Sequence, residues 1–201
     1  MFGRLHIVPI VAEFLKAYPD IDIRMILADG VANLLEERVD LAIRIASLPD
    51  SSLVATRVGS IRRVVCGSPA YFAERGVPAK PHDLSTQNCI TRDGQSFENF
   101  WTFNTGKSSM TIAIHARLIV NTAEAAIDAA VAGGGVTRVL SYQIVDAVRA
   151  GTLVAVLEDF EPEPLPVNLV YAAQGLLPLK LRAFIDFAVP RLKAKFPSLA
   201  F

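Results

Sequence analysis

Segments with helical periodicity alternate along this chain with short segments that have the composition of strands. In the first expected helix, apolar residues recur every three or four positions, which leaves one face to be buried. A strand, a crossover helix and a second strand form a right-handed parallel unit, so this order predicts an α/β fold with parallel sheets. The expected strands are 21–27, 40–46, 53–58, 62–67, 110–120, 136–140, 153–157 and 166–172. The expected helices are 5–18, one opened by Asp29-Gly30, one after Ser68-Pro69, 123–132, one from Ser141 to Ala150, and 177–196.

Local signals place several helix ends. Ser68-Pro69 offers a hydroxyl cap followed by proline at the first helical position, and Thr122 can cap the alanine-rich helix that follows it. The run 133–135 consists of three glycines, but it follows a helix and precedes a strand, the reverse of the order in phosphate-binding loops. It therefore predicts the end of a helix and a tight entry into a strand.

The composition excludes several classes of protein. Hydrophobic residues make up 52% of the 201 residues, which is typical of a folded chain. Twenty basic residues balance twenty acidic ones, so no net field draws the chain to nucleic acid or to anionic lipid. The longest uncharged run, 164–179, is short and interrupted by prolines, and the N-terminus lacks a signal-peptide pattern, so we expect neither a membrane span nor secretion. Basic residues that we interpret as solvated surface are Arg62, Arg63, Arg191, Lys193 and Lys195.

No residue pattern indicates catalysis. His6, His82 and His115 lie in separate segments without acidic partners at ligand spacing, so no metal site is predicted. No serine lies in a GxSxG motif, and no cofactor-binding motif is present. Cys66 and Cys89 lack CxxC spacing and are expected to be buried thiols in a reducing compartment. We therefore predict a protein that is not an enzyme and needs no cofactor.

Five segments carry a resemblance to a known family. They read FGRLHIVPIVAEFLKAYPDI, ERVDLAIRIASLPDSSLVATRVG, RRVVCGSPAYFAERGVP, VTRVLSYQI and LPVNLVYA. Together they resemble the effector-binding domain of LysR-type transcriptional regulators, over nearly the whole chain.

This resemblance implies two Rossmann-like lobes joined by two crossover strands, the type 2 periplasmic-binding-protein-like fold. An effector would bind in the cleft between the lobes. On this view lobe I is 1–62 plus 173–201, the hinge strands are 63–66 and 166–172, and lobe II is 67–165. Two extended connections resist translation but can bend, which suits a change in lobe angle.

Two departures from the family pattern stand out. The family places a winged helix-turn-helix and a linker helix before this domain, and the 201 residues contain neither. Related domains also begin with a strand directly before the FGR segment, whereas here Met1 precedes Phe2. We therefore expect the first, central strand to be missing and its neighbours to lack hydrogen-bond partners.

Ligands of open α/β sheets bind beyond the carboxyl ends of strands, where helix N-termini present free N–H groups. The ligand-binding residues predicted in this way are Phe2, Gly3, Asp29, Gly30, Arg44 and Ile45 in lobe I and Asn121, Thr122, Thr137 and Arg138 in lobe II. Asn121 and Thr122 suit plain helix capping equally well, and capping is the stronger interpretation of Asp29. Arg44 is either a cation of the cleft or a rim residue in an ion pair.

The predicted function is that of a small-molecule sensor in a bacterial transcriptional regulator. The resemblance implies an effector such as a carboxylate or an aromatic metabolite, a homodimer or tetramer with helices 5–18 and 123–132 in its interface, and a cytoplasmic location. DNA would be contacted only through a domain absent from this chain. The alternative is a solute-binding component of a transport system on the same fold, which would require a signal peptide.

Overall fold

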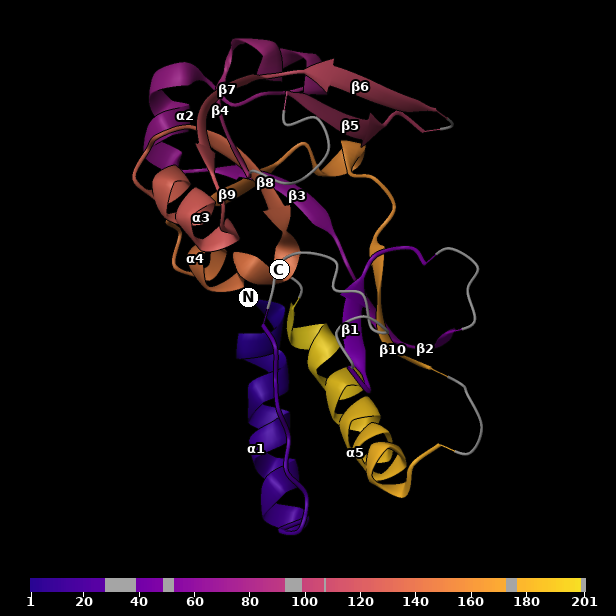
Figure 1. The fold of residues 1–201 in the computed structure, drawn as a ribbon. Helices are drawn as coiled ribbons and strands as arrows, with labels where there is room; N and C mark the ends of the chain where they lie inside the picture. The colour runs from indigo at the N-terminus through magenta and orange to yellow at the C-terminus, as the bar shows by residue number, and fades with distance from the viewer. Residues whose placement is uncertain (28–38, 49–52, 93–98, 107, 173–176, 200–201) are drawn as a thin grey trace. The chain divides into compact units, whose positions relative to one another are not determined.

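The computed structural model describes residues 1–27, 39–48, 53–92, 99–106, 108–172 and 177–199. The chain divides into two compact units (Figure 1). Unit 1 consists of Met1–Ile61 and Leu165–Ser198, and unit 2 consists of Arg62–Pro164 and Leu199–Phe201. The two segments predicted as hinge strands are both strands, 63–66 in unit 2 and 166–172 in unit 1. Their role as a hinge stays a prediction.

Unit 1 contains a three-stranded sheet in the order β1-β10-β2. Strand β10 (Leu165–Ala172) lies between β1 (Ala42–Ile45) and β2 (Leu53–Ile61) and is antiparallel to both. Its central residues are buried, among them Asn168, whose side-chain amide donates to the carbonyl oxygen of Ala46 at 3.4 Å.

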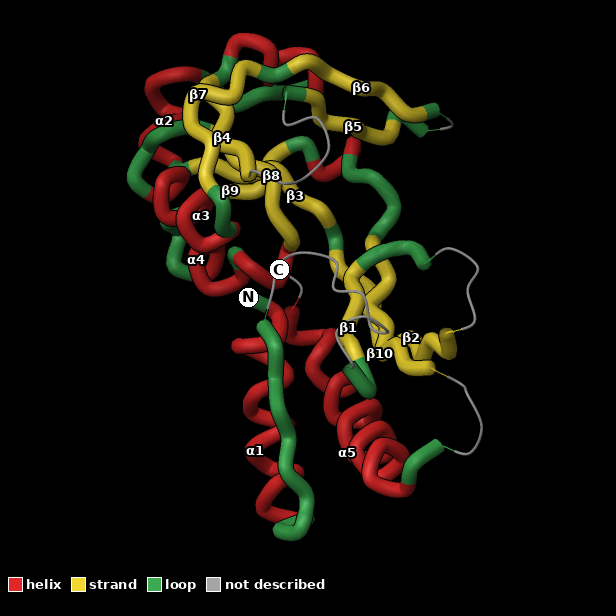
Figure 2. Tube along the Cα trace, in the orientation of Figure 1, coloured by secondary structure: helices red, strands yellow, loops and turns green. Residues whose placement is uncertain are grey.

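Two helices of unit 1 pack against each other through aromatic rings. A π-helical turn (Gly3–Ile7) leads into α1 (Val8–Ala17), which lies beside α5 (Leu179–Lys195) in Figure 2. Phe14 of α1 is fully buried, and its ring centroid lies 5.1 Å from that of Phe184 and 5.4 Å from that of Phe187 in α5. Both contacts are edge-on, the arrangement that aromatic pairs prefer. A 3-10 turn (Phe196–Leu199) follows α5.

Unit 2 is built on a five-stranded mixed sheet in the order β7-β4-β8-β3-β9. Strand β4 is parallel to β7 and β8, whereas β3 is antiparallel to β8 and β9. A separate hairpin is formed by β5 and β6. The strand bounds are β3 Arg63–Gly67, β4 Asn88–Arg92, β5 Phe100–Asn104, β6 Ser109–Ala113, β7 His115–Val120, β8 Val136–Leu140 and β9 Val154–Val156. The helices are α2 Pro69–Arg75, α3 Ala123–Val131 and α4 Val145–Arg149, with 3-10 turns at Pro81–Thr86, Ser141–Gln143 and Glu158–Phe160.

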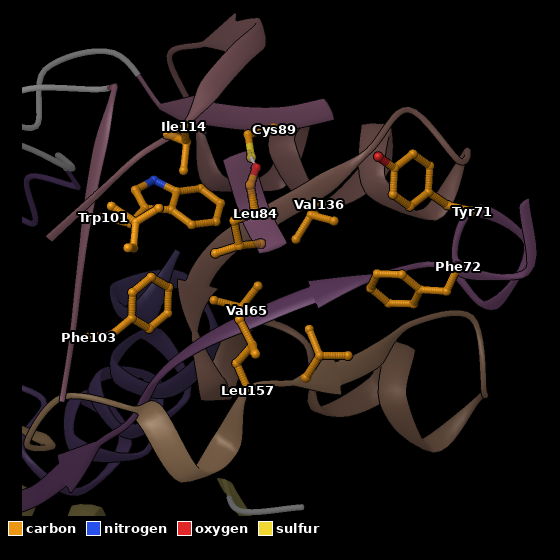
Figure 3. Packing of buried hydrophobic residues seen from close by; sticks show 12 residues of the cluster. Val65, Tyr71, Phe72, Leu84, Cys89, Trp101, Phe103, Ile114, Val136 and Leu157 are labelled. Atoms are coloured by element: carbon orange, nitrogen blue, oxygen red, sulfur yellow. Dashed lines mark hydrogen bonds between the residues drawn. The ribbon is translucent and has the colours of Figure 1, made fainter. Parts of the chain in front are cut away.

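A hydrophobic cluster covers each face of this sheet, because side chains alternate along each strand. In β3, Val65 belongs to one cluster and its neighbours Val64 and Cys66 to the other. The hairpin-side cluster (Figure 3) consists of Val65, Tyr71, Phe72, Leu84, Cys89, Trp101, Phe103, Ile112, Ile114, Val136, Val156 and Leu157. The helix-side cluster consists of Val64, Cys66, Ile90, Ala126, Ile127, Ala130, Val139, Ile144 and Leu153.

Most expected elements are confirmed, including both predicted caps. The hydroxyl of Ser68 accepts from the N–H of Tyr71 at 3.3 Å, and that of Thr122 accepts from the N–H of Ala125 at 3.2 Å. The expected strand 110–120 is instead two strands that meet at Ile114, since β6 pairs with β5 while β7 pairs with β4.

Three other expectations are wrong. Segment 21–27 is not a strand, because no strand among the described residues pairs with it. Ser141 starts a 3-10 turn rather than capping a continuous helix, and its N–H donates to the carbonyl oxygen of Arg62. Among the strands that the structure describes, only β4 pairs in parallel, with β7 and β8, so neither of these two sheets is purely parallel. The helix expected after Asp29-Gly30 falls largely outside the described residues.

Within the part of the chain that the structure describes, every helix is too short or too polar to cross a bilayer. The same residues contain no group of three or more histidine, cysteine or acidic side chains that could hold a metal ion.

Candidate functional site

One edge of the sheet in unit 2 gathers the polar residues that could bind a ligand. Because β4, β7 and β8 are parallel, their carboxyl ends meet at this edge. Strand β3 runs the opposite way and begins at the same edge with Arg63. Helix α3 also starts there, directly after Asn121 and Thr122. Asn121 and Thr122 thus lie at the position where open α/β sheets bind ligands, whereas Thr137 and Arg138 lie inside β8, with Thr137 level with Ile90 in the middle of β4.

Arg63 and Arg138 share the hairpin-side face of the sheet. Each lies two residues from a member of the hairpin-side cluster on its own strand, Val65 in β3 and Val136 in β8. Arg63 pairs with Leu140 and Val65 with Arg138, so the two arginines are diagonal neighbours. Backbones at diagonal positions of an antiparallel pair are about 7–8 Å apart, within reach of long side chains.

Arg138 is held in one orientation by the β5–β6 hairpin. Its Nη1 donates to the carbonyl oxygen of Thr102 at 3.1 Å. Its guanidinium carbon lies 5.2 Å from the ring centroid of Trp101, which is a cation–π distance. Trp101 is itself only 4% exposed. The guanidinium plane is therefore positioned before any ligand arrives.

No carboxylate in the described part of the chain balances the charges of these two arginines. Among the described residues, neither Arg63 nor Arg138 has an acidic side chain at ion-pair distance. Burial lowers the pKa of Arg138 to about 9, with a further contribution from the charge of Arg63. Burial also lowers the pKa of Arg63, followed by the charge of Arg92. Both guanidinium groups lie in surroundings that disfavour their positive charge, and an anion nearby would offset this effect.

Two threonines lie close to these arginines in the sheet but on opposite faces. Thr91 shares the hairpin-side face with the arginines, whereas Thr137 lies on the helix-side face. Thr137 is 1% exposed, and its hydroxyl donates to the carbonyl oxygen of Ile90 at 3.0 Å, which ties β8 to β4. Thr91 is 6% exposed and shares the hairpin-side face with Cys89, one residue beyond the β4–β8 pairing. Its Oγ1 is buried and has no hydrogen-bond partner among the described residues. A buried hydroxyl in this state can donate to a bound anion.

Arg62 differs from Arg63, although the two are adjacent in the sequence. Its Nη1 lies 3.0 Å from Oε2 of Glu158 and 3.1 Å from Oε1 of Glu161, so its charge is compensated. The interpretation of both arginines as solvated surface is therefore wrong, because Arg62 is ion-paired and Arg63 is partly buried. Sequence reasoning missed Arg63, although its spacing of two from a buried valine is the signal that places it on an interior face.

The predicted residues of unit 1 that the structure describes belong to two segments, the π-helical start of the chain and strand β1. Phe2 is buried, and its ring centroid lies 4.8 Å from that of His6 and 6.5 Å from that of Phe196. The next residue, Gly3, is closely packed, because a Cβ added to it would lie 2.6 Å from Cδ2 of Leu27. The second segment is β1, where partly exposed Arg44 and Ile45 are found and Arg44 pairs in register with Asn168. Asp29 and Gly30 lie outside the described residues.

A shallow hollow of about 390 Å³ lies elsewhere in unit 2, at the amino end of β4. Glu74 and Arg75 on its wall pair with each other at 3.8 Å. The carboxyl edge of the sheet is the stronger candidate, because Arg63 and Arg138 are partly buried there and are diagonal neighbours.

The two cysteines are buried on opposite faces of the sheet, Cys66 in β3 and Cys89 in β4, with β8 between these strands. Strands two apart are about 9–10 Å from each other, too far for a disulfide. Burial raises the pKa of both thiols from 9.0 to about 12. We expect an aromatic disulfide reagent to modify them slowly in the folded chain and rapidly in urea. Rapid modification without urea would contradict this burial.

The raised pKa of the two thiols predicts that stability depends on pH. Unfolded thiols ionise near 9.0, whereas the buried thiols keep their protons until about pH 12. The unfolded state therefore binds fewer protons in this interval, and the free energy of unfolding should fall as the pH rises from about 9 to about 12. Replacing both cysteines by alanine should reduce this dependence in urea titrations at several pH values.

Comparison with known proteins agrees with this architecture. The family model described as "LysR substrate binding domain" matches residues 1–193. An HTH-type transcriptional regulator of Xanthomonas campestris pv. campestris is 31% identical over 194 residues, covering 94% of this chain and 56% of the relative. The HTH-type transcriptional activator AaeR of Escherichia coli is 27% identical over 175 residues, covering 87% of this chain and 57% of the relative. The chain thus spans about half the length of these relatives.

Two solved structures show the same fold. The regulatory domain of CrgA from Neisseria meningitidis superposes with a TM-score of 0.80 at 26% identity, covering 95% of this chain and 94% of that one. The regulatory domain of AphB from Vibrio vulnificus superposes with a TM-score of 0.81 at 24% identity, covering 94% and 93%. The fold is that of a type 2 periplasmic-binding-protein-like, ligand-binding domain. The chain belongs to the LysR substrate-binding domain family.

Proposed function

We propose that this chain senses a small molecule for a cytoplasmic transcriptional regulator and catalyses no reaction. The observation that carries the proposal is the carboxyl edge of unit 2. There Arg63 and Thr91 offer side-chain donors without hydrogen-bond partners among the described residues, and Arg138 offers a guanidinium group without an acidic partner among them. The family model and the regulators named above support the sensing role. A transport component on the same fold finds no support among those relatives.

We propose that residues of each lobe contact the effector. The contact residues proposed are Phe2, Gly3, Asp29, Gly30, Arg44, Ile45, Asn121, Thr122, Thr137 and Arg138. The hydroxyls of Thr122 and Thr137 already serve the protein, one as a helix cap and the other as a link between strands. These two residues would therefore act through their backbone groups or by holding the edge in place.

The output proposed is a change in the relative populations of two lobe or dimer arrangements. A ligand can shift such an equilibrium only by its difference in affinity for the two states. A DNA-binding domain joined to this one would convert that shift into altered operator contacts.

A homodimer or tetramer is part of this proposal. Large apolar side chains are exposed on both helices expected in the interface. Leu5, just before α1, and Val8, its first residue, are each more than a third exposed, and so is Val131 at the end of α3. Large exposed apolar side chains of this kind are typical of an interface with another chain. Sedimentation of the purified chain tests the idea, because a monomer at high concentration would contradict it.

Thermal unfolding in the presence of a library of charged and neutral metabolites tests the sensing function. A compound present at one hundred times its Kd adds roughly 2.7 kcal/mol to the free energy of unfolding, which raises the midpoint by roughly 5–10 °C in a domain of this size. Family-unrelated α/β proteins serve as controls for general effects of the compounds. If no compound raises the midpoint selectively, the sensing function is wrong.

A further inference from the structure

We propose that Arg63 and Arg138 together bind an oxyanion of the effector, either a carboxylate or a phosphate. This inference rests on the proposed sensing function and names the chemical class of ligand at the same site. It is specific to unit 2 and makes no use of the arrangement of the two units.

The geometry suits an oxyanion. The two guanidinium groups extend from diagonal positions on neighbouring strands, over the same face of the sheet. Arg138 is fixed by Thr102 and Trp101, with one of its Nη atoms engaged in the bond to Thr102. A guanidinium group presents five N–H donors in a planar fork that matches the two oxygens of a carboxylate or phosphate. The guanidinium group of Arg63 makes no hydrogen bond within the described part of the chain, so its donors are available to a ligand.

The distribution of charge points the same way. Arg62, next to Arg63 on the chain, has two glutamates for its one guanidinium. After burial, the charge of Arg63 lowers the pKa of Arg138 and the charge of Arg92 lowers the pKa of Arg63, and no carboxylate among the described residues pairs with Arg63 or Arg138. Partly burying like charges side by side is unfavourable, and an anion placed between them would offset that cost. A hydroxyl donor, Thr91 Oγ1, lies buried on the same face without a partner among the described residues.

A purely structural role explains Arg138 but not Arg63. Arg138 could serve only to fasten the β5–β6 hairpin to the sheet through Thr102 and Trp101. Arg63 makes neither contact. Replacing Arg63 therefore separates ligand binding from support of the hairpin, and Arg63→Gln is the informative variant.

Trp101 provides a reporter inside the site. It is the single tryptophan of the chain and lies against the Arg138 guanidinium. The purified 201-residue chain is titrated with sodium benzoate, inorganic phosphate and sodium sulfate at constant ionic strength, with sodium chloride as the reference. We expect a saturable change in Trp101 emission with at least one oxyanion and none with chloride.

The variants then assign the signal to the site. Arg63→Gln leaves the Arg138–Trp101 contact in place and should weaken oxyanion binding by about tenfold or more, as expected for loss of a charged hydrogen bond. Arg63→Lys should retain part of the affinity. Arg117→Gln is the matched control, since it removes the same charge from an exposed position on β7 and should bind as the unmodified chain does. Thermal unfolding of each variant verifies that it is folded.

The outcomes distinguish this inference from the sensing function. Saturation by benzoate alone identifies a carboxylate ligand, and saturation by phosphate or sulfate alone identifies a tetrahedral anion; either result supports the site. Equal binding by the unmodified chain and Arg63→Gln overturns it, as does the absence of any oxyanion response. If a neutral compound raises the unfolding midpoint while oxyanions do nothing, the oxyanion site is wrong and the sensing function stands. If no compound of any charge binds, both are wrong.

Discussion

Replacing Gly135 by alanine is expected to lower the free energy of unfolding by about 3–5 kcal/mol. Its φ of 153° lies in a region that side chains rarely adopt, and an added Cβ would lie 2.3 Å from the carbonyl oxygen of Asn88. That oxygen belongs to the backbone at the start of β4, so it cannot move aside without disturbing the sheet. Urea unfolding followed by Trp101 emission measures the effect.

Gly151→Ala is the matched control for this prediction. Gly151 also has a positive φ, 71°, but nothing lies within 4 Å of an added Cβ. Only the backbone strain remains, which costs about 1–2 kcal/mol. Equal losses in the two variants would show that the contact with Asn88 has no energetic weight.

Replacing Phe14 by alanine should cost about 3–5 kcal/mol, because it removes a fully buried aromatic side chain and leaves a cavity. The ring joins α1 to α5 through its edge-on contacts with Phe184 and Phe187. The loss should appear as a lower urea midpoint and a lower thermal midpoint, detected by circular dichroism so that the signal covers unit 1.

Lys16→Ala on the same helix is the control for Phe14→Ala. Lys16 is exposed, so its replacement should change the free energy of unfolding by less than about 0.5 kcal/mol. A loss of similar size in both variants would mean that α1 is destabilised as a helix rather than through its packing. Phe14→Leu should recover part of the lost stability, because it fills part of the cavity.

Short-range features of this protein were predictable from its sequence. The caps at Ser68 and Thr122 depend on residues three positions away, and both form as expected. The glycine run at 133–135 ends one helix and enters a strand, as its order in the sequence indicates. The family was recognisable for a related reason, since its motifs are contiguous stretches of sequence.

Pairing between distant segments was less predictable. The alternation through 110–120 continues across Ile114, because two successive strands share the same period although they pair with different partners. Segment 21–27 has the composition of a strand, yet composition does not supply the hydrogen-bonding partner that a strand requires. The antiparallel sheet of unit 1 depends on β10, a strand that arrives more than a hundred residues after β1 and β2.

The sequence by itself determined the α/β class, the family and most helix and strand positions, because periodicity and capping depend on neighbours a few residues apart. Only the tertiary structure showed that Arg62 is ion-paired, whereas Arg63 has no acidic partner among the described residues. The glutamates that neutralise Arg62 lie 96 and 99 positions away in the chain, and strand register sets Arg63 on the same face as Arg138. Which arginine keeps an uncompensated charge at the candidate site therefore depends on contacts between segments far apart in the sequence, and no local pattern encodes these contacts.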